Sequence, residues 1–587
     1  MNTQYKAIAT VILVSLASFA GMAQQDTTKL KKEVEVVKAY QPTIQEFQKI
    51  NDIPQIKTEP AEPPTFDYSI FSKPVFTTFD PTPVAAAKMV GEPKAELGNG
   101  LLNLGMGNYE TPYGELFFNA RPDKKSSFGL HFKHLSSSGD VKLLNEDVVK
   151  APESLNLGDL FLERYMHKST LTARLGFDRH AVAYYGYASD LLSDEEKQQM
   201  IPWYGQKQYF AKGTASIRLK SEAPLSSGMN YDVKAQYHYF ASKTGQTEHE
   251  FVASGNFAKK FDKMLGLLDA SFSVYRADSI MSRLTSTYGN VTQQLLRANP
   301  SVKWAADVAS LQIGLNATAV LESKTDAKFY LSPKVNAEWS PVPEVLTLFG
   351  TADGYVKQNT YSAVAAENPY VNPYHDLANT NYQYVLSGGF KGKFTPKTNY
   401  VASATYSVVK DQHFYEIRSF HDQTTTPLST ILNNTFYWTY DDVNILKLSG
   451  EVLHSVSDEF SIHLLGNYYS YKLKTIEKPW NMPNFEATLS GIYKPNEKFK
   501  FTADIFLVGK RTALINDYSS TFSLASPVAQ EISMDPIIDL NFGAEYYFSK
   551  NLNFFCKLNN LGFQRYEQWL GYTTKNFNWL AGISYKF

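Results

Sequence analysis

The side chains that could do chemistry are eleven histidines, scattered carboxylates and one cysteine. His131 and His134 are three residues apart, which places them on opposite faces of a strand and makes them a poor metal pair. Residues 248–250 (EHE) put two carboxylates on one face and the imidazole on the other, as expected of a polar row. Cys556 has no second cysteine to pair with. No Ser-His-carboxylate grouping stands out, so we expect no enzyme activity, no metal and no cofactor.

Charge and composition narrow the class of protein further. With 57 Lys and Arg against 58 Asp and Glu, the net charge is −1, so no positive field attracts nucleic acid. Aromatic residues make up 14% of the chain, including 38 Tyr and 38 Phe, and the fold has to account for this excess. A chain of 587 residues would ordinarily form more than one soluble domain, but length alone is a weak argument.

The first residues predict export. Lys6 precedes an apolar stretch, 7–20, which ends in small residues at Gly21 and Ala23, and this order is typical of a secretory signal peptide covering residues 1–23. After residue 24 no run of about 18 apolar residues occurs, so a helical membrane protein is excluded. A membrane-embedded mature chain would therefore have to be a β-barrel.

Residues 24–93 differ in composition from everything that follows. Because proline breaks helices and gives no ladder hydrogen bond, we predict an extended periplasmic or lumenal arm here. Within the arm, the alternating segment Glu33, Val34, Glu35, Val36, Val37 and Lys38 suits a short strand that could bind a partner at a sheet edge. The nine prolines of the arm are Pro42, Pro54, Pro60, Pro63, Pro64, Pro74, Pro81, Pro83 and Pro93.

From about residue 94 the chain alternates apolar and polar residues to its end, as in 230–239, 311–321, 400–408 and 538–548. The runs are longer than the roughly 5 to 6 residues usual in soluble proteins, and a tilted bilayer crossing needs about 9 to 11. Aromatic residues stand at the ends of the apolar rows, where a membrane has its interfaces. We therefore expect the apolar rows to face lipid.

The connections between these runs alternate between short and long, as in barrels with short periplasmic turns and long outer loops. The sequence thus predicts an all-β fold, a transmembrane antiparallel β-barrel of about 22 strands spanning residues 94–587. The expected long loops are 137–154, 188–206, 279–291, 359–379, 421–432, 511–533 and 562–575. The expected strands are 94–108, 113–121, 126–136, 155–167, 169–187, 207–221, 229–242, 245–258, 265–278, 292–305, 308–322, 327–340, 345–358, 380–394, 398–420, 433–455, 459–473, 483–494, 498–510, 534–549, 551–561 and 576–587.

The last strand resembles the terminal strand that the barrel-assembly machinery recognises in bacterial outer-membrane proteins. It carries Phe577, Trp579, Ile583, Tyr585 and Phe587 on one face and ends on an aromatic residue. Together with 539–548 and 557–561, it is similar to the closing strands of TonB-dependent receptor barrels. The resemblance implies location in the outer membrane of a Gram-negative bacterium, with its lipid and the assembly machinery as partners.

The resemblance covers the barrel only. Receptors of this kind carry a folded plug domain that is larger than the segment 24–93, so we expect no globular plug. Residues 33–38 are similar to the short box by which such receptors engage TonB, which makes TonB, or another periplasmic or envelope protein, a candidate partner.

A barrel of this size encloses a lumen that something must occupy. The arm, a partner protein or inward-folded outer loops could fill it. A candidate lid is the proline- and tyrosine-containing loop with Asn368, Pro369, Tyr370, Pro373 and Tyr374. The alternative for this segment is a surface loop without contact to the lumen.

Three functions remain open at this level. The first is substrate uptake across the outer membrane, or service as the barrel component of an envelope complex. The second is a passive porin-like channel, and the third a non-transporting structural or assembly factor. The cargo is not readable from the sequence, because outer loops determine it.

Overall fold

The computed structural model describes residues 99–186, 207–222, 228–282, 287–322, 325–372, 377–421, 434–519 and 528–587. The chain divides into two units, Met1–Pro93 and Lys94–Phe587, and every described residue belongs to the second. The predicted signal peptide, the proline-rich arm and residues 33–38 lie outside the described residues. So do Pro373 and Tyr374 of the candidate lid loop.

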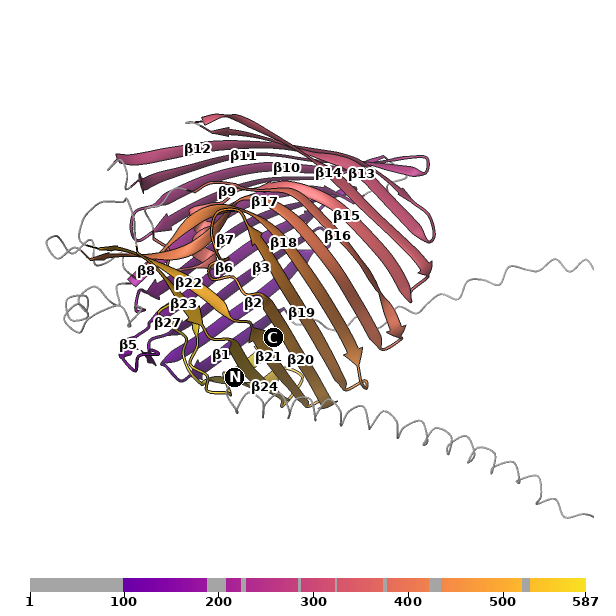
Figure 1. Ribbon diagram of the computed structural model, residues 1–587. Coiled ribbons are helices and arrows are strands. Elements are labelled where there is room, and N and C mark those ends of the chain that lie inside the picture. Colours follow the sequence, from indigo (N-terminus) through magenta and orange to yellow (C-terminus); the bar gives the residue numbers. More distant parts are fainter. Residues whose placement is uncertain are drawn as a thin grey trace, which may run out of the picture. The chain divides into compact units, whose positions relative to one another are not determined.

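The second unit is a closed antiparallel β-barrel (Figure 1). Its sheet has 24 strands, of which β22 and β23 lie outside the ring, so 22 strands form the wall. The first and last wall strands pair with each other and close the ring. The wall strands are β1 Gly100–Gly107, β2 Thr111–Asp123, β3 Ser126–Ser137, β6 Glu153–Tyr165, β7 Ser169–Ala183, β8 Lys207–Ser221, β9 Met229–Ser242, β10 Thr247–Phe261, β11 Met264–Ser282, β12 Thr287–Ala305, β13 Ala309–Glu322, β14 Thr325–Val342, β15 Leu346–Lys357, β16 Thr380–Thr395, β17 Thr398–His421, β18 Phe436–Ser455, β19 Phe460–Leu473, β20 Phe485–Asn496, β21 Phe499–Val508, β24 Ile537–Tyr547, β25 Leu552–Asn559 and β28 Asn578–Lys586.

The predicted fold class and strand number are confirmed. One expected loop is wrong: much of 279–291 is strand, because β11 and β12 stay paired as far as Ser282 and Thr287. Four other expected loops contain short elements of their own. These are β4 Asp140–Lys142 with β5 Val148–Lys150, α3 Tyr361–Glu367, β22 Arg511–Ser519 with β23 Val528–Met534, and β26 Glu567–Trp569 with β27 Tyr572–Thr573.

The period-two pattern separates the two faces of the wall as expected. On β10, Phe251 is 42% exposed on the outer face, whereas Glu248 on the inner face is 4% exposed. Exposed Leu, Ile, Val and Phe side chains recur on the outer face of the wall strands, as a lipid-facing wall requires. Among the described residues, no helix is long and apolar enough to cross a membrane.

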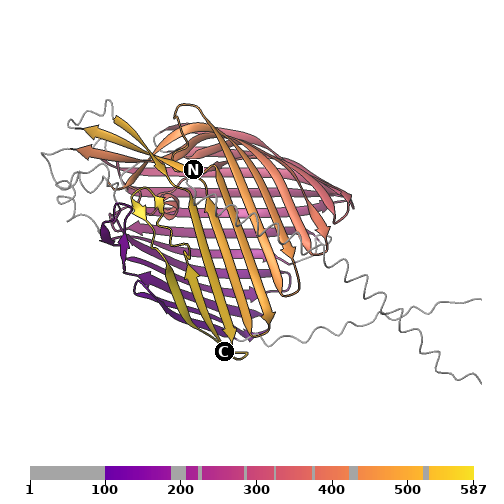
Figure 2. The ribbon, with the colours of Figure 1, turned by 60° about the horizontal axis from the view of Figure 1, so that its bottom comes forward.

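The barrel has two unlike ends. At one end, which we call the short-turn end, most neighbouring strands are joined by tight turns, and the C-terminus lies there as well (Figure 2). The opposite end, the long-loop end, carries α3 and the extra hairpins. The largest buried cluster of the protein lies at the long-loop end, and it is made by these loop elements together with inward-facing residues of the wall.

Candidate functional site: a lid at the long-loop end

Three connections fold together at the long-loop end, and we call their described residues, 358–372, 511–519 with 528–534, and 560–577, the lid. They contain α3, the hairpin β22–β23 and the hairpin β26–β27. Figure 2 shows α3 beside the yellow hairpin β26–β27, and Tyr361, Val364, Leu570 and Tyr572 share one buried cluster. The lid therefore shares an apolar core with the inner wall rather than being a set of separate surface loops.

Helix α3 begins with a conventional cap. The hydroxyl of Thr360 accepts a hydrogen bond from the backbone N–H of Ala363, and the apolar side chains of Tyr361, Val364 and Ala365 are buried. The wall supplies a second acceptor, because the carboxylate of Glu248 on β10 accepts hydrogen bonds from the backbone N–H groups of Tyr361 (2.5 Å) and Ser362 (3.0 Å). A buried carboxylate thus fixes the start of the helix to the wall.

The two ends of α3 contact different parts of the wall. Tyr361 packs edge-on against Phe210 of β8 and Phe240 of β9, with ring centroids 6.2 and 5.9 Å apart. Glu367, at the other end of the helix, lies 3.4 Å from the Nε2 atom of His413 on β17. Seven strands separate β9 from β17 on one side of the ring and thirteen on the other. The helix therefore connects distant parts of the barrel mouth.

The charge state of Glu367 depends on this second contact. Burial opposes its ionisation, but the imidazole of His413 and the ammonium of Lys357 outweigh burial and hold the pKa of Glu367 below its ordinary value. At neutral pH the carboxylate of Glu367 is therefore charged, and it lies beside the imidazole of His413.

The segment after α3 contains the described part of the candidate lid loop. Asn368 and Val371 are fully buried. Val371 forms an isolated bridge to Phe436 on β18, the N–H of Asn372 donates to the carbonyl of Phe436 (2.7 Å), and the N–H of Phe436 donates to that of Tyr370 (2.9 Å). The segment thus adds to the inner surface of the wall.

Three tyrosines join the connections of the lid. The rings of Tyr370 and Tyr572 stack with centroids 3.5 Å apart, and Tyr185, which follows β7, meets both edge-on. The hydroxyl of Tyr572 donates to the carbonyl of Asn434 (2.6 Å), and that of Tyr185 to the carbonyl of Thr573 (3.0 Å). Burial raises the pKa of Tyr185 to about 12 and that of Tyr370 well above its ordinary value, so both stay neutral.

The hairpin β22–β23 is attached to the wall and to the neighbouring lid hairpin. β22 pairs in parallel with the end of β17, from Ile417↔Ile515 to His421↔Ser519. The guanidinium of Arg511, at the base of the hairpin, donates to the carbonyls of Glu567 (2.7 Å) and Gln568 (2.6 Å). These contacts link two connections that are far apart in the sequence.

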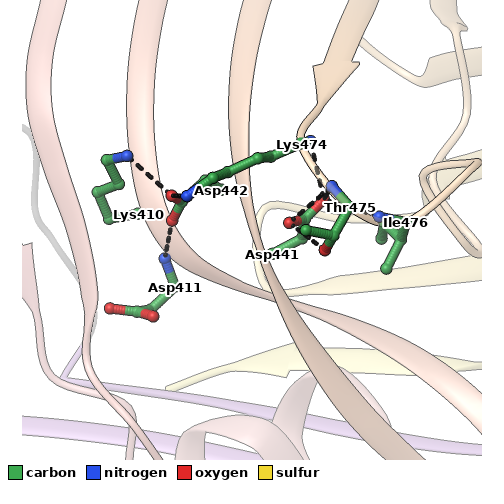
Figure 3. Close-up of polar contacts among 7 residues, drawn as sticks. All are labelled: Lys410, Asp411, Asp441, Asp442, Lys474, Thr475 and Ile476. Atoms are coloured by element: carbon green, nitrogen blue, oxygen red, sulfur yellow. Dashed lines mark hydrogen bonds and ion pairs between the residues drawn. The ribbon is translucent and has the colours of Figure 1, made fainter.

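A neighbouring connection, 474–484, is held by a pair of aspartates on β18 (Figure 3). The carboxylate of Asp441 accepts hydrogen bonds from the N–H groups of Lys474 (3.0 Å), Thr475 (2.9 Å) and Ile476 (3.1 Å), and from the Thr475 hydroxyl (2.7 Å). Asp442 instead pairs with the ammonium groups of Lys410 (2.8 Å) and Lys474 (3.0 Å). Trp480, further along, packs in a cluster with Leu514 of β22, so this connection supports the lid from the side.

Away from the lid, the inner wall is polar. A hollow of about 510 Å³ lies along the inner face of β21, β24, β25, β28 and β1, next to the strand pair that closes the barrel. It is lined by Lys500, Asp504, Glu545 and Lys557 among others, and Lys500 and Glu545 form an ion pair of 2.8 Å. Polar side chains of both signs suit a water-filled lumen.

Four of the five residues predicted as an assembly signal lie on the outer face at the last strand, whereas Phe577 precedes β28 and its ring lies 5.2 Å from that of Phe563. Trp579, Ile583, Tyr585 and Phe587 are 39–46% exposed there. The carbonyl of Phe587 accepts from the N–H of Gly100 (2.8 Å), and the N–H of Phe587 donates to the carbonyl of Gly100 (3.0 Å). The terminal residue therefore takes part in closing the barrel.

Sequence reasoning missed the residues that hold the lid. Glu248 was expected in a polar row, which is correct, but its role as a helix cap depends on a segment far away in the chain. A local signal for α3 was present, since Thr360 precedes an alanine-containing apolar run. No local sequence pattern indicates that Asp441 accepts hydrogen bonds from the backbone of 474–476.

Known proteins were compared with this chain by sequence and by structure, and only the structures are informative about its fold. No family model and no curated protein matches the sequence. Solved structures do match. The copper transporter OprC superimposes with a TM-score of 0.61 at 13% identity, over 84% of this chain and 83% of its own.

Two further matches are receptors. A mutant of the ferric enterobactin receptor PfeA from Pseudomonas aeruginosa gives a TM-score of 0.59 at 13% identity, over 84% of this chain and 80% of its own. The siderophore receptor PirA from Acinetobacter baumannii gives 0.60 at 11% identity, over 84% and 80%.

The fold is that of the outer-membrane receptor barrels. This confirms the resemblance to TonB-dependent receptors for the barrel part of the chain and agrees with an outer-membrane location. At 9–13% identity the likeness concerns the fold and not the ligand.

Proposed function

We propose that this protein is an outer-membrane uptake barrel whose outer mouth is shut by its own loops. The observation that carries the proposal is the attachment of the lid on both sides: α3 contacts β8, β9 and β10 at one end and β17 at the other. A surface loop without a role in the lumen would not need an apolar core and a buried carboxylate to hold it across the mouth.

The interlocked structure of the lid favours gated passage over a passive pore. The stacked pair Tyr370 and Tyr572 joins two connections, so opening requires the loss of buried aromatic contacts and cannot be a small side-chain motion. The similar barrels described as a copper transporter and as siderophore receptors support uptake of a solute rather than catalysis. A ligand would first meet the outer surface of the lid.

Single-channel recording tests this function. Purified full-length protein in planar bilayers should show no steady large conductance, and a variant in which 511–534 is replaced by a short Gly-Ser turn should show it. A steady conductance of the unmodified protein would support a passive porin instead. Circular dichroism and heat-modifiable migration of both proteins establish that the barrel is folded.

The proline-rich arm, 24–93, is the proposed contact to periplasmic proteins, and filling of the lumen by this arm is the alternative to closure by the lid. Under that alternative, deletion of 24–93 should increase the sensitivity of cells to large antibiotics, and unchanged sensitivity would reject the role of the arm in the lumen. Cross-linking from residues 33–38 separates the partners: capture of TonB supports driven uptake, and capture of another periplasmic protein supports an envelope complex.

A further inference from the structure

The ladder between β14 and β15 is incomplete. β14 pairs with β13 from Ala309↔Trp339 through Val320↔Lys328 and on to Thr325. On its other side, the ladder to β15 runs only from Val342↔Leu346 to Val335↔Ala352. Within the described residues, the stretch 328–334 of β14 therefore has a strand partner on one side only.

The sequence explains why the ladder stops. Two residues beyond the last pair, Val335↔Ala352, β14 contains Pro333, which has no N–H to donate, and prolines within sheets belong at edges. Opposite it, β15 parts from β14 but stays paired with β16 as far as Lys357↔Thr380. At Gly354 of β15, an added Cβ would lie 2.7 Å from the Cβ of Ser332. The two strands therefore cannot continue side by side.

The end of β15 is held inside the barrel. The carbonyl of Gly354 accepts hydrogen bonds from the side chains of Ser332 (2.8 Å) and Asn316 (3.0 Å), and that of Val356 accepts from Arg297 (3.1 Å). Val356 is 3% exposed and packs in a cluster with Leu295 and Val320 on the inner face of the wall. Because β15 is fixed in this position, it does not cover the edge of β14.

The uncovered edge is also unusually apolar on its outer face. Phe329 is 78% exposed and Leu331 is 69% exposed, the two highest values among the large hydrophobic residues that the structure describes. Lipid-facing residues elsewhere on the wall, such as Phe272 and Leu268 on β11, are 38% and 39% exposed because neighbouring strands flank them.

The edge lies at a depth where water cannot replace a partner strand. Trp339 stands near the short-turn end of β14 on the outer face, as aromatic residues do at a membrane interface. About ten residues of a tilted strand cross the bilayer, so the crossing ends near Phe329. Unpaired backbone groups in this region are destabilising by several kcal/mol each, since lipid offers no hydrogen bonds.

We infer that residues 328–334 of β14 are a docking edge for an extended segment of a partner protein in the outer membrane. The segment adds one strand to the wall by backbone hydrogen bonds. Its apolar side chains, at every second position, lie beside Phe329 and Leu331, and a carboxylate on its other face pairs with the exposed ammonium of Lys328. Seven residues offer an edge of about 23 Å at roughly 3.3 Å per residue.

A second copy of this chain does not fit the edge. Two barrels in one membrane are related by an axis along the membrane normal, and barrel strands are tilted by about 35–45° from that normal. Such an axis makes the two β14 edges cross at a large angle, so no ladder forms. A partner with a differently inclined segment is required.

Site-specific cross-linking in native outer membranes tests the inference. The photoreactive residue p-benzoylphenylalanine is placed at 329, at 331 and, as a matched control on the outer face of β16, at 390, where Phe390 is 44% exposed. Positions 329 and 331 should cross-link to residues two apart in one extended segment of a single protein, identified by mass spectrometry, and position 390 should not. Cross-links to lipid only, to a second copy, or to scattered sites of many proteins would overturn the inference.

A double variant supplies an independent readout. Phe329→Ser with Leu331→Ser should reduce the co-purified amount of the cross-linked protein at least about tenfold, whereas Phe394→Ser, at a site 68% exposed near the short-turn end, should not. Heat-modifiable migration verifies that each variant forms the barrel. Equal recovery of the partner with the double variant would contradict strand addition at this edge.

Discussion

The ring of Tyr370 stacks on the ring of Tyr572 at a centroid distance of 3.5 Å and an interplanar angle of 16°. One residue follows α3 and the other lies in the hairpin before the last strand, so the contact joins the middle of the chain to its end. Each ring belongs to a different connection of the lid. The proposed closure of the mouth therefore predicts that this pair holds the lid together, which makes it the first target for experiment.

Tyr370→Ala should open the lid. Removing a buried aromatic ring is destabilising by about 3–5 kcal/mol, and 1.4 kcal/mol is already tenfold in an equilibrium, so the open probability in planar bilayers should increase at least about tenfold. Tyr572→Phe, which loses the hydrogen bond to Asn434 and keeps the ring, should have a smaller effect of about 0.5–1.5 kcal/mol. Tyr384→Ala, on the outer face, is the control. A silent Tyr370→Ala channel would show that closure does not depend on the stack.

Acidification should loosen α3 through Glu367. Because the pKa of Glu367 is below its ordinary value in the folded protein, its contribution to stability is present above about pH 4.5 and is lost as the pH falls through the lowered pKa. The protection of the amides of 361–367, corrected for the intrinsic pH dependence of exchange, should therefore fall below about pH 4.5. Glu367→Gln should exchange faster at neutral pH and lose this pH dependence.

Glu344→Gln is the matched control for that measurement, because Glu344 lies in a turn at the short-turn end and its side chain is 79% exposed. It should leave the exchange of α3 unchanged. An unaltered pH profile in Glu367→Gln would assign the acid sensitivity to another group.

The two neighbouring aspartates of β18 should differ in effect. Asp441→Ala leaves the backbone N–H groups of Thr475 and Ile476 without their acceptor, while that of Lys474 keeps the carbonyl of Asp442 (3.1 Å). Hydrogen bonds to a charged group contribute about 1.5–3 kcal/mol. Amide exchange across 474–484 should accelerate at least about tenfold. Asp442→Ala removes ion pairs with partly exposed lysines, which contribute about 0–1 kcal/mol, and should change exchange little. Equal effects of the two variants would contradict this assignment.

Removal of Phe587 should impair closure of the barrel. Its backbone pairs with Gly100, and its ring covers that glycine so closely that a Cβ there would meet the ring Cζ at 2.3 Å. Deletion of Phe587 should lower the yield of heat-modifiable barrel in outer membranes by a large factor, while Lys586→Ala, on the inner face, should retain it. Normal assembly of the deletion variant would reject Phe587 as part of the signal.

The sequence by itself determined the barrel and its strand number. Period-two alternation is a local property: each strand must place its apolar row toward lipid, so residues such as Phe251 and Glu248 are sorted to opposite faces without knowledge of any partner. The alternation of short turns and long loops then orders the strands, because antiparallel neighbours follow one another in the chain. The expected loop 279–291 was wrong because β11 and β12 stay paired beyond the membrane-spanning part of the hairpin.

Only the tertiary structure decided how the mouth is closed and where the wall is open. Glu248 caps α3, Tyr370 meets Tyr572, and Asp441 holds 474–476, and each contact joins segments that are distant in sequence. The same is true of β14, whose edge is uncovered because the far end of β15 is bound inside by Asn316 and Arg297. A periodic pattern specifies the face that a side chain occupies, but contacts between loops depend on which strands the closed ring brings near each other.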